Sequence, residues 1–148
     1  LGTSLGLATA SMALAAPGAK IDTLEGCPET AGVARSMFNS HQFANVELHV
    51  GEFDSNLPDL LQQNKYDFIF FDGNHQREAT LQYFEMCLKA AGESSIFIFD
   101  DIHWNWEMEE AWDEIKRHEK VTLTIDSFQW GWTFFHKGRE KEHFVLRM

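Results

Sequence analysis

Acidic residues follow the strand-like stretches of this sequence, and their carboxylates are the groups best suited to bind or activate a ligand. Residues of this kind close four stretches: Glu25, Glu52, Asp72 and the pair Asp100-Asp101. Where parallel strands alternate with helices, the carboxyl ends of the strands meet at one edge of the sheet, and ligands bind there. We therefore expect these acids to gather around a ligand.

Asp72 and His75 form a candidate acid–base pair in the segment Asp72-Gly73-Asn74-His75. A carboxylate that ends an apolar strand is costly to place unless it is solvated, paired or bound to a ligand. Gly73 allows a sharp turn, which leaves Asn74 and His75 facing the same opening. Because imidazole titrates near neutral pH, His75 can take a proton from a substrate hydroxyl. A hydrogen-bonded structural histidine is the alternative.

The adjacent carboxylates of Asp100 and Asp101 are candidate metal ligands. Together with Asp72 on the neighbouring strand, they supply the oxygen ligands that Mg²⁺ or Ca²⁺ prefers. The competing interpretation is that one of the pair caps the following helix while the other faces water. The sequence thus predicts either a divalent-cation site built from three aspartates or a structural use of the pair.

Glycines and small hydroxyl residues open the chain in the segment Gly2-Thr3-Ser4-Leu5-Gly6, before an alanine-rich helical run. Glycine has no Cβ to keep a ligand away from the backbone, and the first N–H groups of a helix point at an approaching ligand. A tight turn is the alternative. A buried strand should precede such a loop, so we expect the first strand to be missing from this chain.

Glu25 lies about twenty residues beyond these glycines and is followed by Gly26. An acid at this spacing can accept hydrogen bonds from the ribose hydroxyls of an adenosine. The competing interpretation is a helix cap or a solvated turn residue. We favour the ribose role, because the spacing is the one expected for nucleotide binding.

The composition limits the class of partner. The net charge of −11 argues against a nucleic-acid ligand, since phosphate binding needs clustered lysine and arginine. Polar residues interrupt every apolar run before it reaches the length of a membrane span. Cys27 and Cys87 have no metal-binding or redox spacing, which fits a reducing cytoplasm. We expect a cytoplasmic globular domain that binds neither nucleic acid nor membrane.

Helical and strand-like segments alternate along most of the chain. The expected strands span 19–25, 46–50, 66–72 and 95–101, and the expected helices span 7–16, 28–38, 57–63, 78–91 and the region around 108–115. The apolar runs before Asp72 and Asp100 are typical of strands that are buried on both faces. This order predicts a mostly parallel sheet with helices on both faces.

The C-terminal part has a different pattern. Strands are expected over 121–128 and 132–136, joined by Gln129-Trp130-Gly131. Because this connection is too short for a helical crossover, the two strands must pair antiparallel. Trp130 lies at the turn, where packing demands little, whereas core or rim packing explains the neighbouring tryptophans. Residues 142–147 are either another short strand or a tail.

Together these motifs resemble the Rossmann-like S-adenosylmethionine-dependent methyltransferases, and within them the small-molecule O-methyltransferases. The resemblance covers essentially the whole chain and is most specific in Leu1–Gly6, Tyr66–His75, Phe99–His103 and the final hairpin. It implies a three-layer α/β fold, and one methyltransferase domain over residues 1–148 that lacks the first strand and any N-terminal helices. The hairpin, and G-x-x-x-G in place of G-x-G-x-x-G, separate this family from NAD-dependent dehydrogenases.

The resemblance implies S-adenosylmethionine as the cofactor. In this family the glycine loop holds the methionine part, the acid after the second strand binds the ribose, and residues after the third strand flank the adenine. The corresponding contacts in this sequence would come from Gly2, Thr3, Ser4, Gly6, Glu25, Gly26, Glu52, Phe53 and Asp72.

The resemblance also bears on a metal and a base. Metal-dependent members, such as catechol O-methyltransferase, place an Asp after the fourth strand and an Asp-Asn pair after the fifth. Asp72 and Asp100 match, whereas Asp101 replaces the asparagine, so Mg²⁺ or another divalent cation stays an open expectation. Those members carry a lysine base three residues beyond the first Asp, where this sequence has His75. The Asp-Gly-x-His pattern also resembles a broader group of bacterial O-methyltransferases.

We expect an O-methyltransferase that acts on a small hydroxylated molecule, with His75 as its base and Asp72 beside it. The alternatives are a degenerate domain that binds the cofactor without catalysis and, less favoured, an NAD-dependent oxidoreductase. Without its first strand the sheet would expose two apolar edges, so self-association into a homo-oligomer is also expected.

Overall fold

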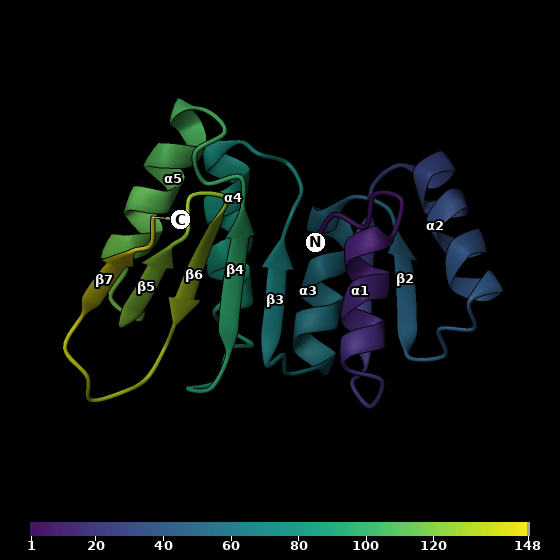
Figure 1. Ribbon diagram of the computed structural model, residues 1–148, viewed down its shortest axis with the longest axis horizontal. Helices are drawn as coiled ribbons and strands as arrows, with labels where there is room; N and C mark the ends of the chain where they lie inside the picture. The colour runs from purple at the N-terminus through teal and green to yellow at the C-terminus, as the bar shows by residue number, and fades with distance from the viewer. Residues whose placement is uncertain (148) are drawn as a thin grey trace. The chain divides into compact units, whose positions relative to one another are not determined.

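The computed structural model describes residues 1–147 and consists of two compact units, Leu1–Asp59 and Leu60–Met148. Each unit has its own β-sheet (Figure 1). Within the described residues, no helix has both the length and the apolar character that a membrane span requires. The two units are described separately below.

The first unit is built on two parallel strands, β1 (Ile21–Glu25) and β2 (Val46–Val50). Helix α1 (Leu7–Ala15) precedes β1, and helix α2 (Pro28–Ser40) connects the two strands. Pro28 is the first residue of α2, as the sequence predicts, because that position needs no intrahelical N–H bond. The unit therefore contains a strand–helix–strand connection of the kind that parallel pairing requires.

The core of the first unit lies between its helices and one face of its sheet. Ala10, Ala34 and Phe38 are buried together, and Leu48 packs against them. Gly6 comes close to this core and has a left-handed backbone with φ +88°. A Cβ on Gly6 would lie 2.8 Å from the Met37 side chain, so only glycine fits the turn between the loop and α1.

The second unit contains a five-stranded sheet with the order β3-β4-β6-β5-β7. Its strands are β3 (Phe68–Phe71), β4 (Ile96–Asp100), β5 (Leu123–Asp126), β6 (Trp130–Phe134) and β7 (Glu142–Val145). Strand β6 runs antiparallel to both β4 and β5, whereas β3 with β4 and β5 with β7 are parallel pairs. The antiparallel hairpin is thus confirmed, and residues 142–145 form a strand.

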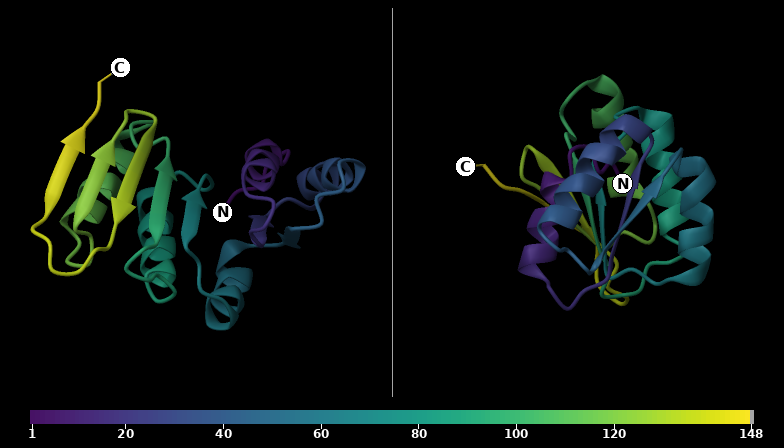
Figure 2. Two further views of the ribbon diagram at one scale, coloured as in Figure 1. Left: turned by 60° about the horizontal axis from the view of Figure 1, so that its bottom comes forward. Right: turned by 90° about the vertical axis from the view of Figure 1, so that its right-hand side faces the viewer.

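Helices α4 (Arg77–Cys87) and α5 (Trp106–Arg117) pack on the same face of this sheet (Figures 1 and 2). From α4, the ring of Phe84 contacts Phe97 and Phe99 of β4. From α5, Trp112 contacts Phe99 and covers Gly131, where a Cβ would lie 2.7 Å from the indole. Gly131 therefore allows the helix to approach the sheet closely.

Several element boundaries differ from those expected. Helix α3 spans Phe53–Gln63 rather than starting at Leu57, because the Glu52 carbonyl accepts hydrogen bonds from Ser55 and Asn56 and adds a turn ahead of Pro58. Helix α4 ends at Cys87, four residues earlier than expected. These shifts lengthen or shorten elements without changing their order.

Strand β3 is buried on one face only, whereas its apolar run had indicated burial on both faces. Ile69 and Phe71 are buried, and Phe71 stacks on Phe99 at 4.3 Å, on the face that α4 and α5 cover. Phe68 is 43% exposed. The helices of this unit cover one face of the sheet, so alternate residues of the run stay accessible.

The hairpin turn consists of residues 127–129 rather than 129–131. Ser127 donates its N–H to the Trp130 carbonyl, and Phe128 has φ +72°. Gly131 is inside β6, where it pairs with Phe99 and Asp126. Trp130 is accordingly the first residue of a strand and not a turn residue.

Candidate functional site

The glycine loop is fastened to β1 by backbone and hydroxyl contacts. The N–H groups of Gly2 and Thr3 both donate to the Leu24 carbonyl, at 3.0 and 2.9 Å. The Thr3 hydroxyl is 2.7 Å from that of Thr23, which is 3.1 Å from that of Thr9 on α1. This buried chain of hydroxyls fixes the loop between the strand and the helix.

Glu25 connects the glycine loop to the start of α2. Its Oε2 accepts a hydrogen bond from the Ser4 N–H at 2.8 Å, and its Oε1 accepts one from the Cys27 N–H at 3.0 Å. The backbone beside Gly26 is open, since a Cβ there would meet no atom within 4 Å. The carboxylate is thus oriented by the protein at an accessible edge of β1.

The residues that follow β2 join the same edge. The Gly51 N–H donates to the Glu25 carbonyl at 2.9 Å, and Gly51 has φ +130°. This turn brings Glu52 and Phe53, at the start of α3, next to the end of β1. In the first unit the structure therefore gathers the loop residues Gly2, Thr3, Ser4 and Gly6 with Glu25, Gly26, Glu52 and Phe53.

Asp72 and His75 lie in the second unit, on the loop after β3. His75 Nε2 is 3.9 Å from Asp72 Oδ1, and the two side chains are 28% and 30% exposed. The His75 carbonyl accepts a hydrogen bond from Asn105, the N-cap of α5, at 3.4 Å. The Arg77 N–H donates to Glu107 on the same helix at 3.1 Å. The start of α5 therefore holds the loop in place.

Asp72 carries an unusual charge environment. Burial and the neighbouring Asp100 carboxylate raise the pKa of Asp72 to about 7, and Asp101 adds a smaller repulsion. The side chain therefore holds its proton far more strongly than an ordinary aspartate. The three carboxylates that the sequence places at adjacent strand ends do lie within electrostatic reach of one another.

Gln129 bridges the other two aspartates. Its Nε2 donates to Asp100 Oδ1 at 3.1 Å and to Asp101 Oδ1 at 2.8 Å. Asp101 has φ +55°, in the left-handed region, so the two carboxylates can turn toward one amide group. Sequence reasoning did not find Gln129, because its only signal was a position near the hairpin turn.

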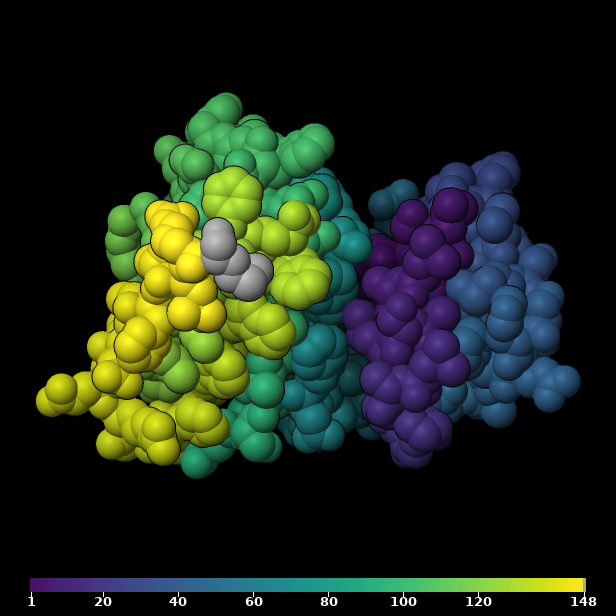
Figure 3. Space-filling view, in the orientation of Figure 1, coloured from purple at the N-terminus to yellow at the C-terminus, as the bar shows by residue number. Residues whose placement is uncertain are grey.

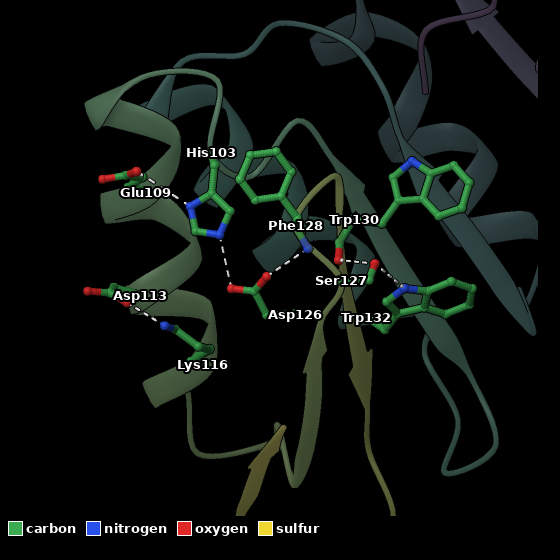
Figure 4. Close-up of polar contacts among 9 residues, drawn as sticks. All are labelled: His103, Glu109, Asp113, Lys116, Asp126, Ser127, Phe128, Trp130 and Trp132. Carbon is green, nitrogen blue, oxygen red and sulfur yellow. Dashed lines mark hydrogen bonds and ion pairs between the residues drawn. The ribbon is translucent and has the colours of Figure 1, made fainter. Parts of the chain in front are cut away.

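A second polar contact joins the same two loops (Figure 4). His103 Nε2 is 3.0 Å from Asp126 Oδ2, and its ring stacks on Phe128 at 5.6 Å. The pKa of Asp126 is lowered overall. Burial alone would raise this pKa, but the hydrogen bonds from the Phe128 N–H and from His103 favour the charged carboxylate more strongly. The hairpin turn is thereby fixed to the loop after β4.

The closest grouping of metal-ligand atoms lies elsewhere. Among residues 1–147, the group whose ligand atoms all lie within 4.8 Å consists of Asp22, Glu47 and His49, on β1 and β2. Lys20 Nζ is 3.5 Å from Asp22 Oδ1 and 3.4 Å from Glu47 Oε2, so its ammonium already offsets one of their two negative charges. The expected set of Asp72, Asp100 and Asp101 is not grouped as closely.

The comparison with known families identifies the chain. A family model described as a methyltransferase domain matches residues 1–102, and the chain belongs to this family. The family assignment confirms the predicted resemblance and establishes methyl transfer as the class of activity. No curated protein matches the sequence.

Solved structures confirm the predicted fold class. A Podospora anserina methyltransferase with bound SAH has a TM-score of 0.80 and 16% identity, and the match covers 92% of this chain and 70% of that one. The Streptomyces achromogenes O-methyltransferase TomG, in complex with SAM, has a TM-score of 0.76 and 21% identity over 91% of this chain and 70% of its own. A Bacillus cereus O-methyltransferase with SAH has a TM-score of 0.68 and 23% identity, and the match covers 90% of this chain and 71% of that one.

Proposed function

We propose that this chain transfers a methyl group from S-adenosylmethionine to a hydroxyl group of a small molecule. The observation that carries the cofactor assignment is the pair of hydrogen bonds to Glu25, one from Ser4 and one from Cys27. Each carboxylate oxygen accepts one of them and keeps a further lone pair, which can accept a hydrogen bond from a ribose hydroxyl. The bound SAM and SAH of the related structures support this choice of cofactor.

The rest of the first unit supplies the remaining cofactor contacts in this proposal. The methionine part would be held by the backbone of the glycine loop, at Gly2, Thr3, Ser4 and Gly6. The hydroxyl contacts of Thr3, Thr9 and Thr23 keep this loop in place. Gly26 leaves room beside the ribose, while Glu52 and Phe53 would flank the adenine.

His75 is the proposed base. The bound cofactor would supply a methyl group on a sulfonium: as the acceptor oxygen bonds to the methyl carbon, the carbon–sulfur bond breaks and its electron pair stays on sulfur. His75 Nε2 takes the proton of the acceptor hydroxyl, and the ionised form of Asp72, whose Oδ1 lies 3.9 Å from Nε2, stabilises the resulting imidazolium. The Asn105 hydrogen bond to the His75 carbonyl keeps this loop positioned.

A divalent cation, if the reaction uses one, would bind to Asp72, Asp100 and Asp101 and lower the pKa of the acceptor hydroxyl. The crowding of negative charge around Asp72 fits such an ion. The donation of Gln129 to both other carboxylates, and the looser grouping of the three, fit it less well. None of the steps above requires the metal.

Calorimetric titration of the whole chain with S-adenosylhomocysteine tests the cofactor assignment, with NADH as control and with and without MgCl₂. We expect micromolar binding of S-adenosylhomocysteine and none of NADH. A folded sample that binds neither, or NADH alone, contradicts the proposal. Binding without methylation of any member of a panel of hydroxylated compounds would instead indicate a domain that holds the cofactor without catalysis.

A further inference from the structure

Trp130 and Asp100 lie directly opposite each other where β6 meets the end of β4. Residues opposite each other in an antiparallel pair point to the same face of the sheet, with their Cβ atoms about 5 Å apart. An indole ring and a carboxylate are therefore neighbours at the carboxyl end of β4, the edge at which the proposed reaction takes place.

The indole of Trp130 is held in place without being buried (Figure 4). It makes an edge contact with Trp132 at 6.2 Å, and Trp132 Nε1 donates to the Ser127 hydroxyl at 3.3 Å. Trp130 is nevertheless 42% exposed, and Phe128 in the adjoining turn is 64% exposed. In the space-filling view, the lime-coloured residues of this turn lie on the surface of the second unit (Figure 3). The ring thus offers an accessible aromatic face at this edge of the sheet.

In the part of the chain that the structure describes, the carboxylates beside this ring have no permanently charged partner, since His75, 3.9 Å from Asp72, is cationic only when protonated. Among the described residues, no lysine or arginine forms an ion pair with Asp72, Asp100 or Asp101. Arg77, which follows the loop after β3, is instead paired with Glu110 and Glu114. The hydrogen bonds of Gln129 orient the Asp100 and Asp101 carboxylates but leave their charge in place.

We propose that the methyl acceptor carries a protonated amine, which binds between the ring of Trp130 and the carboxylate of Asp100. This inference rests on the proposed function and names the chemical class of its substrate. A cation over an indole face is attracted by the ring quadrupole, and the ammonium donates a charge-assisted hydrogen bond to the carboxylate. A neutral acceptor lacks both contacts, and an anionic one is repelled.

The same geometry favours an organic cation over a metal ion at this position. Mg²⁺ requires near-octahedral oxygen ligands, whereas the amide of Gln129 directs N–H groups toward Asp100 and Asp101. An aromatic ring has no ligand atom for Mg²⁺, whereas its face attracts an ammonium group. The pairing of Trp130 with a carboxylate is therefore explained by an amine and not by Mg²⁺.

Three probes of the same shape test this inference: 2-phenylethylamine, 2-phenylethanol and phenylacetate. Their binding to the ¹⁵N-labelled chain is followed through the indole Nε1–H signal of Trp130, which Trp130→Phe assigns. We expect the amine to shift this signal with an affinity at least tenfold above that of the alcohol, and phenylacetate to leave it unchanged. Trp130→Leu lacks this signal, so its affinity is measured by calorimetry, which should show amine binding roughly fivefold weaker than in the wild type.

Two variants separate the contacts. Asp100→Asn should remove the preference for the amine over the alcohol while the alcohol still binds as before. Phe144→Leu, which changes an exposed aromatic residue of β7, is the matched control and should leave all three affinities unchanged. Circular dichroism establishes that each variant is folded.

Equal binding of the three probes, or displacement of the amine by MgCl₂ with a shift of the same indole signal, overturns the inference. Titration with S-adenosylhomocysteine on the same sample keeps the two proposals apart. Cofactor binding without an amine preference refutes this inference and leaves the proposed function intact. An amine preference without cofactor binding refutes the proposed function and leaves only a site for cations.

Discussion

The carboxylate of Glu25 accepts a hydrogen bond from the backbone of Ser4 at 2.8 Å, across 21 residues of chain. Its other oxygen accepts one from Cys27, so the acid joins the glycine loop, the end of β1 and the start of α2. A ribose that binds to this carboxylate would therefore meet a group whose direction is already set. Such preorganisation reduces the entropy lost on binding.

Replacement of Glu25 should weaken cofactor binding more than it weakens folding. Glu25→Ala frees two exposed N–H groups that water can satisfy, so the free energy of unfolding should fall by no more than about 1 kcal/mol. The affinity of Glu25→Ala for S-adenosylhomocysteine should be at least tenfold below that of the wild type, and the affinity of Glu25→Gln should lie between the two. Calorimetry and denaturant unfolding measure the two effects. Glu93→Gln, at a surface pair with Lys137, is the control, and unchanged affinity in Glu25→Ala would exclude the ribose contact.

Two glycine substitutions should change stability in opposite directions. Gly6→Ala places a methyl group 2.8 Å from Met37 at φ +88° and should lower the free energy of unfolding by about 1–3 kcal/mol. Gly32→Ala, inside α2 with open space around it, should raise it by about 0.5–1 kcal/mol. Urea unfolding of both variants measures the difference. Equal effects would mean that the turn at Gly6 relaxes freely.

Asp72 should make the protein less stable as the pH rises. Its folded-state pKa of about 7 lies above the value of about 3.9 for an unfolded chain, so the native state binds the proton more tightly. The stabilisation is complete below pH ~4 and is lost as the pH rises through ~7. Because asparagine does not ionise, the free energy of unfolding of Asp72→Asn relative to the wild type should increase as the pH rises from ~4 to ~7. Thermal unfolding from pH 4 to 8 measures this.

Asp113 serves as a control, because its pKa is shifted in the opposite direction to that of Asp72. A hydrogen bond from Lys116 lowers the pKa of Asp113, so this residue stabilises the protein above its ordinary titration range and loses that effect as the pH falls. Asp113→Asn should thus lose stability relative to the wild type at neutral pH and match it in acid. Parallel curves for the two variants would contradict the raised pKa of Asp72.

A glutamate in place of Gln129 should produce a pH-dependent defect. The new carboxylate faces Asp100 and Asp101, so repulsion replaces two hydrogen bonds once all three are ionised. At low pH the protonated glutamate can donate again, and stability should recover. Gln129→Leu, which loses the hydrogen bonds without adding charge, should show a defect that is independent of pH. Melting temperatures of both variants at pH 5 and pH 8 distinguish the cases.

Substitution of His75 should affect turnover and spare cofactor binding. If Nε2 accepts the proton of the acceptor, His75→Ala should lower kcat by about 10²–10⁴ while the affinity for S-adenosylhomocysteine changes less than threefold. The assay follows methyl transfer to an acceptor found in the hydroxylated panel, with His136→Ala as the control. Full turnover in His75→Ala would show that this histidine is structural.

The parts of the fold that hydrophobic periodicity governs were predictable from the sequence. Met108, Ala111, Trp112 and Ile115 share one helical face, and all four are buried in α5. The hairpin turn was misplaced because Gly131 looked like a turn residue. Its small size serves instead the close approach of Trp112, which is a packing requirement between distant segments.

The candidate site was predictable where its residues end strands and not where they meet across loops. Glu25 and Asp72 follow from spacing and from the cost of placing a carboxylate after an apolar run. The contact of Gln129 with Asp101 spans 28 residues and depends on a left-handed residue in each loop, Asp101 and Phe128. No periodicity encodes such a contact. The exposure of Phe68 likewise depends on which face the helices cover.

The hairpin of residues 123–134 lies beyond the residues that the family model matches, 1–102. It nevertheless supplies Gln129 and Trp130, which meet Asp100 at the edge of the sheet. Under the proposal above, a graft of the turn residues 127–130 from a relative is expected to alter the choice of acceptor, while the pairing of β6 with β4 and β5 keeps the rest of the hairpin in the sheet. A graft must keep a small residue at position 131 for Trp112 and an amide at position 129, and the residue at position 130 is then free to be varied.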